Sequence, residues 1–170
     1  MLRMIKAGME DLDRIDALYK DCINDLLKNG IFQWDYRYPN IEFYKKCIGN
    51  REQYIIFDDE ALIGSVVLNE AQDEEWSKVS WTYMDERTLV IHALAINPFY
   101  QGKGYGQKIL DLCHEYGISN NYRVVRLDVF SENPVALHLY EKNGYKKVGE
   151  VTFAIKPEGH QLYYCYEKLL

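Results

Sequence analysis

Three glycines within six residues form the most informative group of residues in the sequence. The run reads Gln101, Gly102, Lys103, Gly104, Tyr105 and Gly106. Glycine adopts positive φ and lets a ligand approach the backbone closely. An apolar, strand-like run precedes the turn and an amphipathic helical run follows it, so the helix directs its free N–H groups into the turn. This arrangement predicts an anion site, most naturally for phosphate; the alternative is a loop that only needs flexible joints.

The spacing of these glycines excludes two familiar nucleotide motifs. A P-loop needs G-x-x-x-x-G-K-[ST], but Gly106 is followed by Gln107, Lys108 and Ile109, so the hydroxyl that coordinates the metal is missing. A dinucleotide fold needs G-x-G-x-x-G and an acidic residue at a strand end about 20 residues further on. Here the spacing is G-x-G-x-G, and Asp128 falls inside an expected strand. These departures also disfavour a small nucleotide kinase.

The elements that must position this turn follow from the hydrophobic periodicity. Strands are expected near residues 2–7, 53–58, 61–70, 88–96, 124–130, 145–155 and 161–169, and helices over residues 9–29, 41–48, 107–116 and 134–142. The region 71–86 is acidic and expected to be irregular. The order β-α-α-β-β-β-α-β-α-β-β predicts a mixed α/β (α+β) fold, with helices on both faces of a mostly antiparallel central sheet. A length of 170 residues predicts a single domain over residues 1–170.

Three stretches around the glycine turn together match one known pattern. The turn itself fits Q/R-x-x-G-x-G/A, and Leu94-Ala95-Ile96-Asn97-Pro98 precedes it. A third stretch runs from Leu127 through Ser131-Glu132-Asn133-Pro134 to Tyr140 and the closing Gly144-Tyr145. Together they resemble the acetyl-CoA loop, the central strand and the second conserved block of the GNAT superfamily of N-acetyltransferases. The resemblance covers residues 88–150 strongly and residues 2–70 in outline.

The resemblance implies the GNAT acyl-CoA N-acyltransferase fold and the activity of an acetyl-CoA-dependent N-acetyltransferase. The acetyl group would pass directly to a primary amine of a small molecule in a ternary complex. Two alternatives stay open. One is a protein or peptide N-acetyltransferase, and the other is a non-catalytic acyl-CoA-binding sensor module. Related proteins often dimerise, so a homodimer is one assembly that the resemblance allows.

The resemblance also assigns residues to acetyl-CoA. In similar enzymes the amides of the glycine loop bind the CoA pyrophosphate, the central strand pairs with the pantetheine arm through its backbone, and an asparagine contacts the arm. Asn133 occupies that asparagine's position, although its spacing also fits a helix N-cap. The implied cofactor-binding residues are Leu94, Ala95, Ile96, Gln101, Gly102, Lys103, Gly104, Tyr105, Gly106, Asn133 and Tyr140.

Three side chains are candidates for proton transfer. Tyr140 matches the family's usual general acid, which would protonate the leaving thiolate; the alternative is a core aromatic residue. His92 stands before the Leu-Ala run of the central strand, as in arylalkylamine acetyltransferases of this family, and imidazole titrates near neutral pH, so it is the expected base. Glu70 is the second choice, because other members use a glutamate on a neighbouring strand, and water is the third. A backbone amide of the central strand would hold the oxyanion, and no metal is needed.

The acceptor amine is expected to bind at an aromatic stretch over residues 31–40. The candidates for substrate binding are Trp34, Asp35 and Tyr36, because aromatic rings beside a carboxylate can surround a cation. The alternative is a hydrophobic plug between two helices.

Composition limits the classes of protein that fit. The chain is 48% hydrophobic and 27% charged, and no apolar run approaches the ~20 residues of a membrane span. The formal charge is −6, with −7 over residues 1–100 and +1 over residues 101–170, so a nucleic-acid or membrane partner is not expected. The four cysteines show no metal or redox spacing and the N-terminus lacks an apolar signal core, so a cytoplasmic location is expected.

Overall fold

The computed structural model describes residues 1–170, which form two compact units. The first unit consists of residues 1–68 and 92–112, and the second of residues 69–91 and 113–170. The single domain expected over residues 1–170 stays a prediction.

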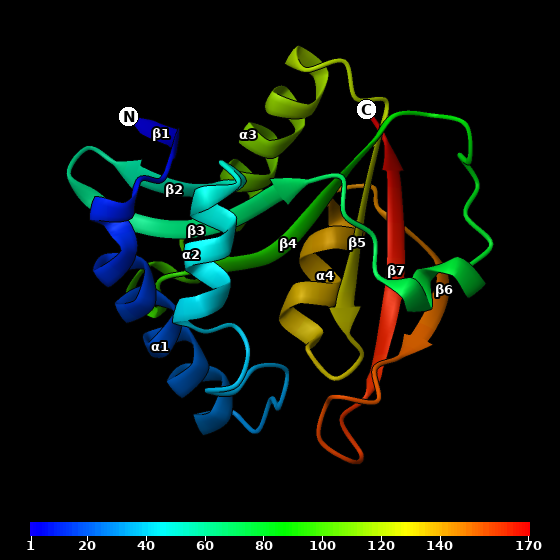
Figure 1. The fold of residues 1–170 in the computed structure, drawn as a ribbon, viewed down its shortest axis with the longest axis horizontal. Helices are drawn as coiled ribbons and strands as arrows, with labels where there is room; N and C mark the ends of the chain where they lie inside the picture. Colours follow the sequence, from blue (N-terminus) through cyan, green and yellow to red (C-terminus); the bar gives the residue numbers. More distant parts are fainter. The chain divides into compact units, whose positions relative to one another are not determined.

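Seven strands follow the order β1-β2-β3-β4-β5-β7-β6 in the sheet (Figure 1). They are β1 (Leu2–Lys6), β2 (Gln53–Asp58), β3 (Ala61–Asn69), β4 (Thr88–Ile96), β5 (Val124–Phe130), β6 (Lys146–Thr152) and β7 (Leu162–Leu169). The β1–β2, β2–β3, β5–β7 and β6–β7 pairs are antiparallel, whereas β4 and β5 are parallel. The mixed, mostly antiparallel sheet expected from the sequence is therefore confirmed.

In the first unit, helices pack on both faces of the strands. Helix α1 (Leu12–Lys28) inserts Tyr19, whose hydroxyl oxygen lies 3.4 Å from the side-chain nitrogen of Gln53, which in turn donates to Ser65. Helix α2 (Ile41–Gly49) packs beside α1 (Figure 1). On the opposite face, α3 (Tyr105–Ser119) approaches Gly64, where a Cβ would touch Ile109 and collide with the Ala95 carbonyl oxygen. Successive residues of a strand point to opposite faces, so Gly64 faces α3 and the neighbouring Ser65 faces α1.

In the second unit, α4 (Pro134–Lys142) covers one face of β7, where the Tyr166 hydroxyl donates to Glu141 at 2.8 Å. The other face is covered by the segment that includes the 3-10 helix η2 (Glu74–Lys78). There the Trp76 indole N–H donates to Asp128 of β5 at 3.0 Å. Both faces of the β5–β7 pair are thus covered.

The structure differs from the expected elements chiefly at α3 and in the acidic region, and by up to three residues at other ends, such as that of β6, which ends at Thr152 and not at residue 155. Helix α3 begins at Tyr105 and not at residue 107, and it continues to Ser119. The first turn of a helix does not need intrahelical partners for its N–H groups, so Gly106 is tolerated there. The acidic region 71–86, which was expected to be irregular, contains η2, because Trp76 anchors it to the sheet.

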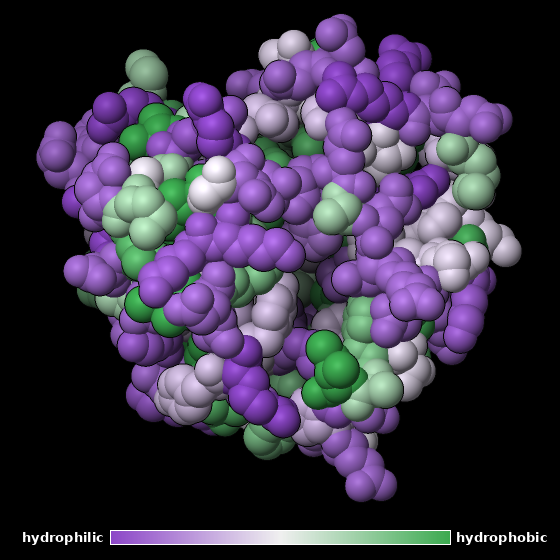
Figure 2. Space-filling model, viewed as in Figure 1, coloured by the Kyte–Doolittle hydropathy of each residue, from purple (hydrophilic) through white to green (hydrophobic).

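The surface shown in Figure 2 is mostly hydrophilic, and the hydrophobic residues on it form small separate spots. No helix combines the length and the apolar character that crossing a lipid bilayer requires.

Candidate active site

The glycine turn has the backbone geometry that an anion site needs. Gly102 and Gly104 adopt φ angles of +71° and +81°, which side-chain-bearing residues rarely adopt. No atom lies within 4 Å of the position that a Cβ would occupy at either glycine. The Lys108 N–H reaches the Gly104 carbonyl oxygen at 3.5 Å, so the amides that precede it lie in the first turn, where no intrahelical acceptor is available. A phosphate therefore has both room and donors at this turn.

Side chains fix the turn to the ends of two strands. Gln101 donates from its amide nitrogen to the Ile96 carbonyl oxygen at 3.0 Å. The Tyr105 hydroxyl donates to Asp58 at the end of β2, at 2.9 Å. The Lys103 ammonium lies 4.4 Å from the centre of the Phe99 ring, so a positive charge stands on the turn itself.

The second half of β4 changes character at His92. Residues 88–91 are buried, whereas residues 92–94 are half-buried. The parallel pairing of β4 with β5 runs over Thr88–Val90. The Asn97 N–H donates to the Ile63 carbonyl oxygen of β3, so by alternation Leu94 and Ile96 direct their amides to the other edge of β4. Leu94 and Ile96 therefore present backbone groups at that edge, as pairing with a cofactor would require. By the same alternation the backbone groups of Ala95 face β3, where its carbonyl oxygen lies against Gly64.

Of the two candidate bases, His92 lies in the first unit, half-buried on β4, whereas Glu70 lies in the second unit. One Glu70 carboxylate oxygen accepts from the Tyr122 hydroxyl at 2.8 Å and from Arg87 at 2.9 Å. The Tyr122 hydrogen bond and then the Arg87 contact lower the pKa of Glu70. A carboxylate stabilised in this way is a weak base, so the geometry argues against the second choice made from the sequence.

Asn133 and Tyr140 lie in the second unit, on α4. The Asn133 side-chain oxygen accepts from the Ala136 N–H at 3.1 Å, which confirms the N-cap. The Tyr140 ring packs edge-on against Tyr145, with the ring centres 5.5 Å apart. Burial raises the pKa of Tyr140, and Cys113 and Asp128 raise it further. Tyr140 therefore stays protonated at neutral pH, as a proton donor must.

The aromatic stretch divides into a buried and an exposed part. Trp34 is 7% exposed and packs against Tyr19 in the core, which agrees with the alternative of a hydrophobic plug and not with a ring that surrounds a cation. Asp35 forms an ion pair with Arg37 at 2.6 Å, and this hydrogen bond lowers the pKa of Asp35. Because Arg37 already neutralises Asp35, this carboxylate is poorly placed to attract a second cation. Tyr36 is 62% exposed and donates to Asn24.

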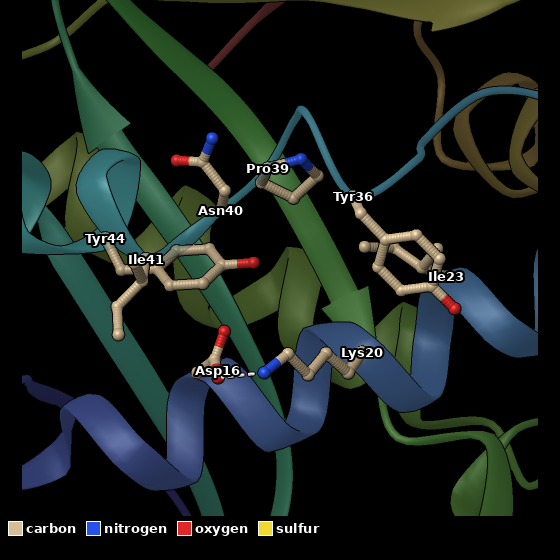
Figure 3. Close-up of a pocket in the computed structure, with 8 residues that line it drawn as sticks. All are labelled: Asp16, Lys20, Ile23, Tyr36, Pro39, Asn40, Ile41 and Tyr44. Atoms are coloured by element: carbon tan, nitrogen blue, oxygen red, sulfur yellow. Dashed lines mark hydrogen bonds and ion pairs between the residues drawn. The ribbon is translucent and has the colours of Figure 1, made fainter.

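A pocket of about 210 Å³ lies in the first unit between α1 and the segment that leads into α2 (Figure 3). Its lining residues are Asp16, Lys20, Ile23, Tyr36, Pro39, Asn40, Ile41 and Tyr44. Asp16 and Lys20 form an ion pair at 2.6 Å. Of the substrate-binding residues predicted from the sequence, Tyr36 lines this pocket. The spacing of Asp16 and Lys20, four residues apart, is visible in the sequence but is equally typical of a solvated helix face.

Comparison with known proteins agrees with the geometry. Residues 16–145 match the family model described as the acetyltransferase (GNAT) family. The chain is 34% identical over 59 residues to the N-alpha-acetyltransferase RimI of Mycobacterium tuberculosis, an alignment that covers 35% of each chain. It is 30% identical over 115 residues to the spermidine N(1)-acetyltransferase of Vibrio cholerae, over 65% of this chain and 60% of the relative. The matched parts thus span about a third and about three fifths of these relatives.

Solved structures show the same fold. A GNAT-family acetyltransferase from Streptococcus agalactiae superposes with a TM-score of 0.84 at 21% identity, over 99% of this chain and 95% of that one. The spermidine N-acetyltransferase of Vibrio cholerae, solved with CoA and spermine, gives a TM-score of 0.73 at 23% identity over the same shares. The fold predicted from the sequence is thereby confirmed. The chain belongs to the GNAT family of acetyltransferases.

Proposed function

We propose that the chain transfers the acetyl group of acetyl-CoA to the primary amine of a small molecule. The observation that carries the proposal is the glycine turn, because Gly102 and Gly104 leave the amides at the start of α3 open to a diphosphate. Family membership supports acetyl-CoA as the donor.

The chain's own residues account for the steps that such a transfer needs. When bound, acetyl-CoA supplies a thioester with an acyl carbon open to attack. The turn over residues 101–106 would hold the pyrophosphate, and the backbone of Leu94 and Ile96 would orient the pantetheine arm. The Leu94 N–H would donate to the acyl carbonyl oxygen. His92 would accept the proton that the amine loses, and Tyr140 would supply the proton that the leaving sulfur gains.

The pocket beside α1 supports a cationic acceptor. Its volume of about 210 Å³ fits a small amine, and the Asp16 carboxylate and the Tyr44 hydroxyl point into it (Figure 3). An incoming ammonium group would have to displace Lys20 from Asp16, just as it would have to displace Arg37 from Asp35. The similarity to a spermidine N(1)-acetyltransferase points to the same class of acceptor.

The test is a thiol-release assay with acetyl-CoA and a panel of amines. The panel contains polyamines, arylalkylamines, amino acids, aminoglycosides and a peptide with a free α-amine. We expect turnover with a small amine, and the Asp16→Asn variant should raise KM for a cationic amine several-fold with kcat nearly unchanged. Asp13→Asn is the matched control, because it removes the same charge from an exposed position of α1 outside the pocket.

Two results would contradict the proposal. Turnover with the peptide alone would favour the protein N-acetyltransferase, which the similarity to RimI makes the second candidate. CoA binding without thiol release for any amine would favour the acyl-CoA sensor.

A further inference from the structure

A buried tyrosine hydroxyl of α1 holds one peptide group of β4. Tyr19 is completely buried, and its hydroxyl donates to the Ala93 carbonyl oxygen at 2.6 Å. The Tyr19 ring is fixed on both sides, stacked on Tyr44 at 4.7 Å between ring centres and tilted against Trp34 at 5.7 Å. The hydroxyl therefore has one position, and a short hydrogen bond from it constrains the acceptor.

A polar chain in the core sets the direction of this hydrogen bond. The Gln53 amide nitrogen lies 3.4 Å from the Tyr19 oxygen and donates to Ser65 at 2.6 Å, and Ser65 donates to the Tyr54 carbonyl oxygen at 2.8 Å. Because the Tyr19 oxygen faces a donor, its own proton is left for Ala93. Burial raises the pKa of Tyr19, so the hydroxyl stays protonated. The Gln53 side-chain oxygen is buried without a partner, so this network costs stability.

The residue that accepts the hydrogen bond has an unusual backbone. Ala93 adopts φ +48°, the left-handed region that residues with a Cβ enter only under constraint. Such conformations persist where the surrounding structure imposes them, and they gather at functional sites. The Tyr19 hydroxyl is the constraint that acts directly on the carbonyl group of Ala93.

This constraint also determines the direction of an amide. In a trans peptide the carbonyl of one residue and the N–H of the next point in opposite directions. The Ala93 carbonyl points to Tyr19, so the Leu94 N–H points away from it. Alternation along β4 places this N–H on the edge away from β3.

We propose that Tyr19 is a positioning residue, which orients the Leu94 amide so that it can donate to the acyl carbonyl oxygen. Tyr19 itself would touch neither substrate. The inference rests on the proposed function, since only an acyl transfer gives the Leu94 N–H a charge to stabilise. Electrostatic donors act through their exact placement, so loss of the Tyr19 hydroxyl should affect turnover more than binding.

The test compares Tyr19→Phe with Tyr166→Phe. Both variants keep the ring of a buried tyrosine and lose its hydroxyl, but the Tyr166 hydroxyl donates to Glu141 of α4, whereas the Tyr19 hydroxyl donates to Ala93 of β4. We expect Tyr19→Phe to lower kcat about tenfold with KM for acetyl-CoA nearly unchanged. We also expect the backbone amide resonance of Leu94, recorded by NMR without substrates, to shift in Tyr19→Phe and not in Tyr166→Phe.

An unchanged Leu94 resonance in Tyr19→Phe would overturn the proposal. Equal values of kcat in Tyr19→Phe and Tyr166→Phe would also overturn it, because they would show either no effect or a general effect of stability. Failure of the proposed function is distinguishable, because the unsubstituted chain would then release no thiol with any amine while the resonance still reports on Tyr19.

Discussion

Individual side chains differ in whether their surroundings let them move a proton. Tyr140 is kept protonated by burial, whereas Glu70 is kept ionised by Tyr122 and Arg87. His92 stands half-buried on β4 beside the left-handed Ala93. These surroundings keep a proton on Tyr140, although the raised pKa also makes its hydroxyl a weaker acid, and they favour His92 ahead of Glu70 as the base.

Replacing Tyr140 by phenylalanine removes the proposed acid and keeps the ring that packs on Tyr145. We expect kcat to fall on the order of 10²-fold, because the leaving sulfur then lacks a proton donor. Thermal unfolding should change little, since the lost hydroxyl leaves the aromatic packing intact. A decrease in kcat of less than about threefold would remove Tyr140 from this role.

The pH dependence of kcat/KM separates the two candidate bases. A base must be unprotonated, so kcat/KM should rise with pH through the range in which imidazole titrates. We expect His92→Gln to remove or displace this rise. Glu70→Gln should leave the profile in place and lower the melting temperature, because it weakens the contacts with Arg87 and Tyr122. The opposite pattern would restore Glu70 as the base.

The proposed phosphate role of the turn before α3 depends on the conformations of Gly102 and Gly104, which a Cβ disfavours. We expect Gly104→Val to abolish CoA binding measured by calorimetry, because a branched side chain would occupy the space in front of the amides. The strain of a left-handed valine costs about 1–2 kcal/mol of stability in its own right. Gly30→Val is the matched control, since Gly30 has φ +71° with equally open surroundings after α1. Loss of CoA binding in both variants, or in neither, would contradict the phosphate role of the turn.

The segment around η2 is attached to β5 and β7 by buried polar contacts. The Trp76 indole donates to Asp128, and the Thr82 N–H donates to the Glu167 carboxylate at 2.8 Å. Glu167 also lies 3.8 Å from the guanidinium of Arg126. These contacts explain why an acidic region without apolar periodicity is ordered in the structure.

Asp128 makes this attachment dependent on pH. Burial and the charge of Asp73 raise the pKa of Asp128 from its ordinary value of 3.8 to about 7, against the opposing effects of Trp76 and Lys156. Between these two values the folded chain binds a proton that the unfolded chain has lost, so stability falls as pH rises. We expect the free energy of unfolding to fall more steeply from about pH 4 to pH 7 in the unsubstituted chain than in Asp128→Asn, which keeps an acceptor for Trp76. Equal slopes in denaturant titrations would contradict this.

Across the chain, the sequence predicts what depends on local pattern. The strands over residues 88–96 and 124–130 agree with β4 and β5 residue for residue, because Pro98 and the glycine and asparagine turns delimit apolar runs. The glycine turn is also a local pattern, because its three glycines lie within six residues of the sequence. Contacts between distant segments were not predictable. The burial of Trp34, the hydrogen bond from Tyr19 to Ala93 and the pocket beside Asp16 all depend on how α1 packs against the strands.

Charge distribution agrees with the proposed acceptor. Residues 1–100 carry a formal charge of −7 and residues 101–170 carry +1. An excess of negative charge attracts cationic amines. The excess of acidic groups thus favours an amine over an acidic acceptor.

The structure of the chain crystallised with CoA tests the central claim most directly. We predict that the pyrophosphate oxygens accept hydrogen bonds of about 3 Å from the main-chain N–H groups of residues 102–106. A turn filled by the protein's own side chains, or a CoA molecule whose pyrophosphate lies elsewhere, would contradict the account.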